Sequence, residues 1–186
     1  PYARSMIARQ RITLLFLILA FAPWLGAAAA ERPLRTVDAL DLQRYMGTWH
    51  QIALLPNWFQ RRCASDTSAT YSANADGTVR VLNRCRKDDG TFVEAEGLAR
   101  RNAAHDRPGI LQVRFAPRFL SALPFVWGDY WVIELTDDYG AVLVGAPSRE
   151  YLWVLARTPT LDEATYTRLV DIARAEGFDV SALIKQ

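Results

Sequence analysis

The sequence predicts an all-β protein: an eight-stranded antiparallel up-and-down β-barrel with one C-terminal α-helix packed outside it. Three observations predict this fold. Eight short strand-like runs follow one another between positions 49 and 158, turn-forming residues separate most of them, and the one long helical pattern comes after the last run. Parallel pairing needs crossovers of about a dozen residues or more, which most connections lack. Closing such a meander into a barrel removes the exposed edges of an open sheet.

The first part of the chain reads as an export signal. Arg9 and Arg11 precede an apolar run that begins at Ile12, and Ala28 and Ala30 form an Ala-x-Ala cleavage site. The alternative is an uncleaved membrane anchor, although a proline and a glycine dilute the far end of the run. We therefore expect a signal peptide over residues 1–30 and one mature domain over residues 31–186.

The expected mature chain is almost neutral. Residues 1–30 hold three arginines and no acid, so their removal leaves 19 basic against 20 acidic residues and changes the formal charge from +2 to −1. Such a surface has no electrostatic footprint for nucleic acid or for an anionic membrane. A bacterial lipoprotein would carry a cysteine at its cleavage point, but the nearest is Cys63. We expect an exported protein, periplasmic or secreted, without a lipid anchor.

The two cysteines predict a disulfide. Cys63 and Cys85 are 22 positions apart in a chain expected to be exported, where paired cysteines are usually bridged. A catalytic thiol is the alternative, but the only histidines, His50 and His105, lie in no recognisable partner sequence. No second histidine or cysteine stands at metal-ligand spacing, so we expect neither a metal site nor a cofactor.

The elements follow in order. A short helical turn is expected just before Gly47, and Asp76-Gly77 and Asp89-Gly90 are pairs that favour hairpin turns. After Pro159 the period changes to that of an amphipathic helix, which Gly177 ends. The expected strands cover residues 49–56, 67–73, 78–86, 91–101, 110–117, 129–137, 141–147 and 150–158.

Three separated motifs resemble those of the lipocalins, specifically the bacterial lipocalin and apolipoprotein D branch. The first is a Gly-x-Trp that opens the first strand, the second a Thr-Asp-Tyr region between the sixth and seventh strands, and the third an Arg that ends the eighth. The resemblance extends from about residue 42 to residue 180. The motif residues are Gly47, Trp49, Thr136, Asp138, Tyr139 and Arg157.

The resemblance implies a structural role for these motifs and a binding role for the barrel. Trp49 is expected to close the narrow end, with Arg157 packed over its ring in a cation–π contact of about 0.5–2 kcal/mol. Lipocalins of this branch bind fatty acids, lysophospholipids or similar molecules in the barrel. The implied function is to bind, and to transport or store, such a ligand in cell-envelope lipid handling, without an enzymatic reaction.

Alternation along the strands then predicts the cavity wall. If Arg157 faces inward, so do the residues two, four and six positions before it, and the family comparison turns Tyr71 inward together with Ala69 and Thr67. On the fifth strand, Leu111, Val113 and Phe115 form the apolar face, while Gln112 and Arg114 are expected to meet solvent. The alternative is a barrel filled by its own aromatic rings. The predicted cavity residues are Tyr71, Val113, Phe115, Tyr151 and Trp153.

Two apolar loops are expected near the mouth. Trp58 and Phe59 follow the first strand, where the family places the loop that covers the opening. The segment 119–127 is a second apolar loop that reaches the same end if the meander holds. These loops suit transient contact with a membrane surface, or alternatively a contact between copies, so both a monomer and a homodimer stay open.

Two rival functions remain at this stage. One is a lipid-acting enzyme, an isomerase or hydrolase on the same scaffold, for which a free Cys63 or Cys85 would be the reactive group. The other is a ligand-free interaction or stress protein with a filled barrel. Thiol counting tests the first, and the presence of a co-purified lipid tests the second.

Overall fold

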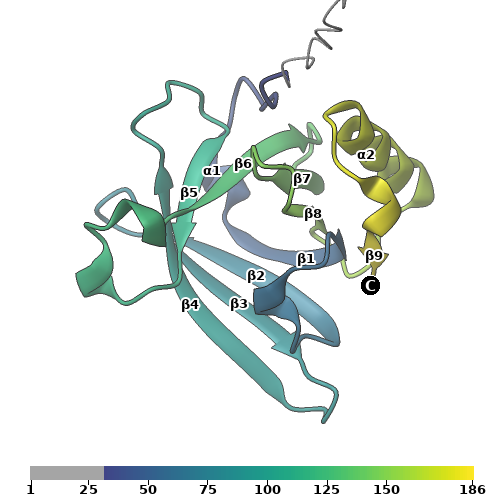
Figure 1. Cartoon of the computed structure of the whole chain (residues 1–186), viewed down its shortest axis with the longest axis horizontal. Coiled ribbons are helices and arrows are strands. Elements are labelled where there is room, and N and C mark those ends of the chain that lie inside the picture. The colour runs from purple at the N-terminus through teal and green to yellow at the C-terminus, as the bar shows by residue number, and fades with distance from the viewer. Residues whose placement is uncertain (1–31) are drawn as a thin grey trace, which may run out of the picture. The chain divides into compact units, whose positions relative to one another are not determined.

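A computed structural model describes residues 32–186, which form a single closed sheet with helices outside it (Figure 1). Each strand pairs antiparallel with the next, and β1 pairs with both β2 and β8, which closes the barrel. The predicted fold is thus confirmed. The signal peptide expected over residues 1–30 lies outside the described residues. The strands are β1 Gly47–Leu54, β2 Ser65–Ala73, β3 Val79–Arg86, β4 Phe92–Arg101, β5 Ile110–Arg114, β6 Gly128–Leu135, β7 Ala141–Gly145 and β8 Leu152–Ala156.

Two α-helices and a ninth strand complete the described part of the chain. The short α1 (Leu42–Tyr45) precedes β1, and α2 (Glu163–Ala175) begins at Asp162, whose carboxylate accepts a hydrogen bond from the Thr165 N–H at 2.9 Å. A short strand, β9 (Ile184–Lys185), was not predicted; it pairs with the last two residues of β1, beyond the point where β2 leaves that strand. The 3₁₀ turns are η1 Trp58–Gln60, η2 Arg118–Leu120, η3 Pro124–Val126 and η4 Val180–Ala182.

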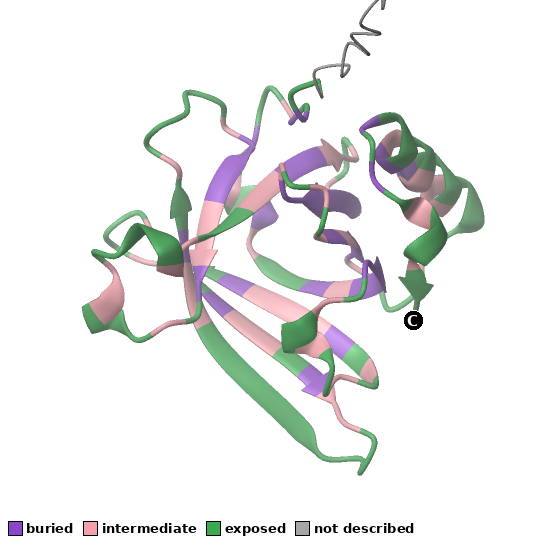
Figure 2. Cartoon of the chain, viewed as in Figure 1, coloured by how far each residue is buried: buried purple, intermediate pink, exposed green. Residues whose placement is uncertain are grey.

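The core has two parts because β7 and β8 are buried on both faces (Figure 2). Leu143 and Val154 point outward and pack with Leu169 and Ala173 of α2, all four almost completely buried. The residues that alternate with them point into the barrel and join a second cluster around Trp49. The amphipathic helix therefore covers the outside of the barrel, as its sequence pattern predicted.

The strands differ in length, and this leaves part of one edge uncovered. β5 has only five residues and pairs with β4 over Leu98–Arg101. The preceding stretch of β4, residues 92–97, has no ladder partner on that side among the described residues, and most of it is exposed (Figure 2). Val93 and Ala95, which share the face of the buried Ala99, are exposed as well. The barrel wall is therefore lower at β5 than at β4.

The expectation that Arg114 meets solvent is wrong. Its side chain is only 6% exposed because the segment that follows β5 folds back over the outer face of the sheet. One guanidinium nitrogen of Arg114 donates to the carbonyl of Ala116, and the Trp127 ring lies 5.3 Å from the Arg114 guanidinium carbon. Alternation gave the outward direction correctly, but it carries no information about a loop that covers that face.

No helix within residues 32–186 has both the length and the apolar character needed to cross a membrane.

Candidate ligand-binding site

One guanidinium organises the narrow end of the barrel. The Trp49 ring is fully buried, and its indole N–H donates to the carbonyl of Tyr45 at 2.9 Å. The guanidinium carbon of Arg157 lies 4.0 Å from the centroid of the Trp49 ring, within cation–π range. The same group donates to the carbonyls of Thr48 at 3.2 Å and Arg44 at 2.6 Å. The ring and its cation together plug this end.

The turn between β6 and β7 completes the plug. The Thr136 hydroxyl donates to the Asp138 carboxylate at 2.5 Å, which holds the pKa of Asp138 below its ordinary value. Tyr139 has a φ of 61°, in the left-handed region. In this conformation its carbonyl accepts from Arg157 at 3.3 Å, and its hydroxyl accepts from the backbone N–H of Asp41 at 2.9 Å. The turn thus joins the sheet to the segment before α1.

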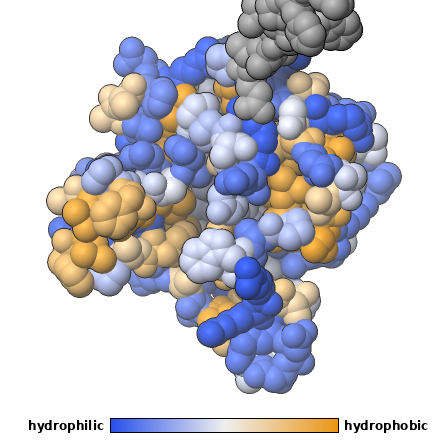
Figure 3. Space-filling view, viewed as in Figure 1, coloured by the Kyte–Doolittle hydropathy of each residue, from blue (hydrophilic) through white to orange (hydrophobic). Residues whose placement is uncertain are grey.

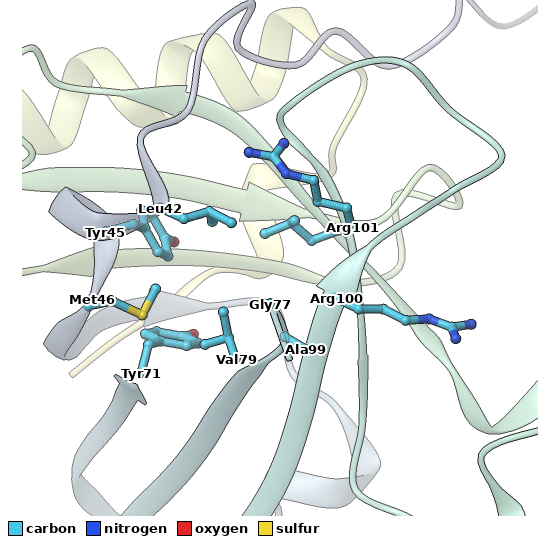
Figure 4. A pocket seen from close by; sticks show the side chains of 10 residues that line it. Leu42, Tyr45, Met46, Tyr71, Gly77, Val79, Ala99, Arg100 and Arg101 are labelled. Atoms are coloured by element: carbon cyan, nitrogen blue, oxygen red, sulfur yellow. The ribbon is translucent and has the colours of Figure 1, made fainter. Parts of the chain in front are cut away.

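A small hollow of about 20 Å³ lies beside this plug (Figure 4). Tyr45 and Met46 border it from the end of α1, and Tyr71 and Val79 border it from β2 and β3. Its volume is close to that of a single water molecule, so it holds no organic ligand.

Three tyrosine hydroxyls form a chain at the base of the barrel. The Tyr130 hydroxyl lies 2.7 Å from the Tyr45 hydroxyl and 2.9 Å from the Tyr71 hydroxyl. Burial raises the pKa of Tyr71 to about 12 and raises the pKa values of Tyr45 and Tyr130 well above the ordinary 10. The three phenols are therefore neutral at physiological pH and act only as hydrogen-bonding groups.

Above the base lies a cavity of about 110 Å³ that opens towards the mouth. Four of the five predicted cavity residues, Tyr71, Val113, Phe115 and Trp153, line it. Tyr151 is not among these lining residues. It lies just before β8, and its ring stacks on Trp153 with centroids 6.2 Å apart and lies 5.8 Å from the Phe59 ring, so its contact with a ligand stays a prediction.

The cavity also has polar wall residues that the sequence reasoning did not single out. Gln51, Asn83 and Tyr130 line it together with Thr67, which was expected to face inward. Gln51 was within reach of that reasoning, since it stands two positions after the inward Trp49 on the same strand. Asn83 and Tyr130 were not, because no motif anchored the alternation of β3 or β6.

A loop tied down by the disulfide borders the mouth. Phe59 lines the cavity and is 48% exposed, while Trp58 is 68% exposed and packs edge-on against it. Cys63 and Cys85 are bridged, with Cα atoms 5.4 Å apart, which confirms the predicted pairing and leaves no free thiol in the chain. The bridge anchors the end of the loop to β3, so the aromatic pair is held close to the opening.

The connection between β5 and β6 reaches the same end of the barrel, as the meander predicted. It forms an apolar patch, defined here as Phe119, Leu123 and Phe125, which Figure 3 shows at the left of the molecule. The two phenylalanines are 82% and 80% exposed. Trp127 at the foot of the patch is held against Arg100, whose guanidinium carbon lies 3.7 Å from the ring.

The acidic strand residues make ion pairs on the outer face of the barrel. Glu96 pairs with Arg80 at 2.7 Å, Glu94 with Arg84 at 3.6 Å, and Glu134 with Arg168 of α2 at 2.7 Å. Across residues 32–186 no three His, Cys, Asp or Glu side chains come together as a metal site would require.

Comparison with known proteins agrees with this architecture. Residues 40–186 match the family described as lipocalin-like domain. Temperature-induced lipocalin-1 of Arabidopsis thaliana is 42% identical over 156 residues, 83% of each chain. Outer membrane lipoprotein Blc of Escherichia coli is 36% identical over 154 residues, 82% of each chain, and apolipoprotein D of Mus musculus is 27% identical over 152 residues, 78% of this chain and 76% of its own.

The fold has solved counterparts as well. Insecticyanin from the tobacco hornworm superposes with a TM-score of 0.62 at 19% identity, over 82% of this chain and 83% of its own. The family match covers nearly all of the described residues, including those that form the plugged narrow end, the cavity and the mouth. On these grounds the chain belongs to the lipocalin family.

Proposed function

We propose that this protein binds a hydrophobic ligand with an acyl chain, such as a fatty acid or a lysophospholipid, and transports or stores it in cell-envelope lipid handling. The observation that supports this most directly is the cavity itself. Its wall is mainly apolar and aromatic, and no Lys, Arg, Asp or Glu of the described residues lines it. Such a site suits alkyl chains.

We also propose that the protein acts by binding alone. The rival enzyme hypothesis required a free cysteine as nucleophile, and the disulfide occupies both cysteines. The relatives of the chain are a lipocalin, an outer membrane lipoprotein and an apolipoprotein, and none of these names denotes an enzyme.

The size of the cavity limits how a ligand fits. Drug-sized ligands occupy pockets of about 300–1,000 Å³, and the cavity here measures about 110 Å³. A lipid therefore places only part of its chain inside. The remainder lies at the mouth, where Phe59 and Phe115, both about half exposed, offer apolar contact.

Export and membrane contact form part of the same proposal. Residues 1–30 act as a signal peptide, the domain from residue 31 onward is periplasmic or secreted, and the protein works as a monomer or homodimer. The apolar patch touches lipid surfaces transiently, because Phe119 and Phe125 project from the mouth end with Arg118 beside them. We expect the double substitution of Phe119 and Phe125 by Ser to abolish co-sedimentation with phosphatidylcholine vesicles while the unfolding midpoint stays unchanged.

The binding proposal is tested by native purification. We expect mass spectrometry of solvent extracts to show an acyl lipid in stoichiometric amount, and added lysophospholipid to quench tryptophan fluorescence saturably. Ala69→Phe places a ring in the cavity and should abolish quenching, whereas Thr70→Phe, on the outer face of the same strand, should not. An empty extract with flat titrations for every lipid would instead favour a ligand-free interaction protein.

A further inference from the structure

We propose that the cavity selects ligands that carry an uncharged carbonyl group, such as an acyl ester, and that Gln51 and Thr67 form the hydrogen-bond donor pair that recognises it. The inference rests on the proposed function, because it names the polar group of the ligand that enters the same cavity. It assigns a specificity role to two residues that no family motif contains.

The first observation is that both side chains are buried without partners. Gln51 is 6% exposed and Thr67 is 8% exposed, and both line the cavity. The Gln51 Nε2 and Thr67 Oγ1 atoms have no hydrogen-bond partner among the described residues. Gln51 follows His50 and Thr67 precedes Ser68, and His50 and Ser68 are the last pair of the β1–β2 ladder, so both residues lie at the mouth end of that ladder. A buried polar group without a partner has lost its hydration without compensation, so a ligand that satisfies both groups gains affinity.

The second observation fixes which atom Gln51 presents. The indole N–H of Trp153 can only donate, and it lies 2.8 Å from the side chain of Gln60, so the Gln60 atom facing it is the oxygen. The amide nitrogen of Gln60 then donates to Gln51 at 2.8 Å, which makes the Gln51 atom on that side its oxygen. The group of Gln51 that is left without a partner is therefore its NH₂. These two hydrogen bonds fix the orientation of the Gln51 amide, so its free group is an N–H donor.

The third observation concerns charge. None of the residues lining the cavity is Lys, Arg, Asp or Glu. A carboxylate enclosed there would lose its hydration without gaining a cation, which is far more costly than burying a neutral carbonyl. One carbonyl oxygen has two lone pairs and can accept from the Gln51 NH₂ and the Thr67 hydroxyl together. The site thus fits an ester carbonyl better than a free carboxylate.

The apolar residues of the wall define where the alkyl chain goes. Val81, Val113 and Leu155 line the cavity with only alkyl groups, and Phe115 extends the apolar wall. The alkyl chain occupies this part, and the carbonyl lies against the β1–β2 side.

The test compares three probes of matched chain length on the purified full chain: methyl laurate, lauric acid and methyl dodecyl ether. We expect methyl laurate to bind about fivefold or more tightly than the ether, which lacks the carbonyl, on the basis of about 1 kcal/mol per neutral hydrogen bond. Lauric acid at neutral pH should bind more weakly than its methyl ester. The readout is the dissociation constant from tryptophan quenching.

Two variants assign the effect to the donor pair. Thr67→Val keeps the shape and removes the hydroxyl, and it should weaken methyl laurate binding about fivefold without changing ether binding. Gln51→Leu removes the donor at similar volume, with the same expected direction. Thr70→Val removes a hydroxyl from the outer face of the same strand and is the matched control. Thr67→Val should fold at least as stably as the parent, since an unpartnered buried hydroxyl is replaced by a methyl group.

The outcomes separate this inference from the proposed function. If ester, acid and ether bind equally and Thr67→Val changes none of them, the donor pair has no role although lipid binding stands. Tighter binding of lauric acid than of its ester would also overturn the inference, because it would place a carboxylate on a cation of the mouth. If no probe binds the parent protein, the proposed function itself fails.

Discussion

Arg157 makes contacts at the narrow end that no other cation could reproduce. Its planar guanidinium lies over Trp49 and donates to three backbone carbonyls, those of Arg44, Thr48 and Tyr139. Gly47 stands close by with a φ of 95°, and a Cβ there would lie 3.2 Å from the guanidinium, so the motif glycine leaves room for the arginine. The motif residues are far apart in the sequence but meet around the Arg157 guanidinium.

We expect Arg157→Lys to lower the free energy of unfolding by about 1–3 kcal/mol, because an ammonium group on a flexible stem cannot reach three carbonyls and cover a ring together. Urea denaturation checks this value. Arg168→Lys, at an exposed ion pair with Glu134, is the matched control and should change stability by less than about 0.5 kcal/mol. Equal effects of the two substitutions would contradict the role assigned to Arg157.

The tyrosine chain at the base gives a second prediction at this scale. Tyr130→Phe removes the central hydroxyl and leaves those of Tyr45 and Tyr71 without it, so it should cost about 1–3 kcal/mol. Tyr71→Phe removes a terminal hydroxyl and takes away only one of the two hydrogen bonds of Tyr130, so it should cost less than Tyr130→Phe. A smaller loss for Tyr130→Phe than for Tyr71→Phe would show that the chain of hydroxyls is not cooperative.

At the scale of elements, loops decide what the strands alone could not. The eight barrel strands, their order and the C-terminal helix followed from turn pairs and from periodicity, which are local properties of the sequence. The short β5, the cover over Arg114 and the pairing of β9 with β1 depend on contacts between distant segments. Likewise β8 begins at Leu152, two residues later than expected, which leaves Tyr151 just before the strand; alternation does not fix such a boundary.

The disulfide is the element-scale feature with the clearest energetic prediction. It closes a loop of 22 positions that contains β2 and most of β3. Replacing both cysteines by Ala should lower the free energy of unfolding by about 3 kcal/mol in the loop-entropy account. Chemical denaturation of the double variant, with reduced parent protein for comparison, measures it. An unchanged midpoint would contradict this account, because it would mean that the bridge does not restrict the unfolded chain.

For the whole molecule, the free energy of unfolding should decrease in acid because several aspartates are hydrogen-bonded as carboxylates in the folded state. Hydrogen bonds from Thr91 lower the pKa of Asp89 from 3.8 to about 2, and turn or cap hydrogen bonds likewise lower those of Asp76, Asp138 and Asp162. A carboxylate whose pKa is lower in the folded state stabilises the fold above its unfolded pKa, and this stabilisation is lost as the pH falls through the folded pKa. Stability should therefore decrease between about pH 4 and about pH 2.

Asp89 offers a way to check the cause. Asp89→Asn should flatten the decline in stability over this acid range, because the amide does not titrate. Asp88→Asn in the same turn, whose side chain makes no such hydrogen bond in the described structure, is the control and should leave the slope unchanged. Urea midpoints measured at several pH values give both slopes.

The low wall at β5 has a consequence for ligand length. Since β4 continues past the end of β5 with residues 92–97 unpaired on that side, the rim of the barrel is notched rather than level. A chain longer than the cavity need not push up through the loop that carries Trp58 and Phe59; it can leave sideways across the exposed inner face of Val93 and Ala95. We expect affinity to rise with chain length until the cavity is filled and then to level off, so that homologues of very different length are carried about equally well.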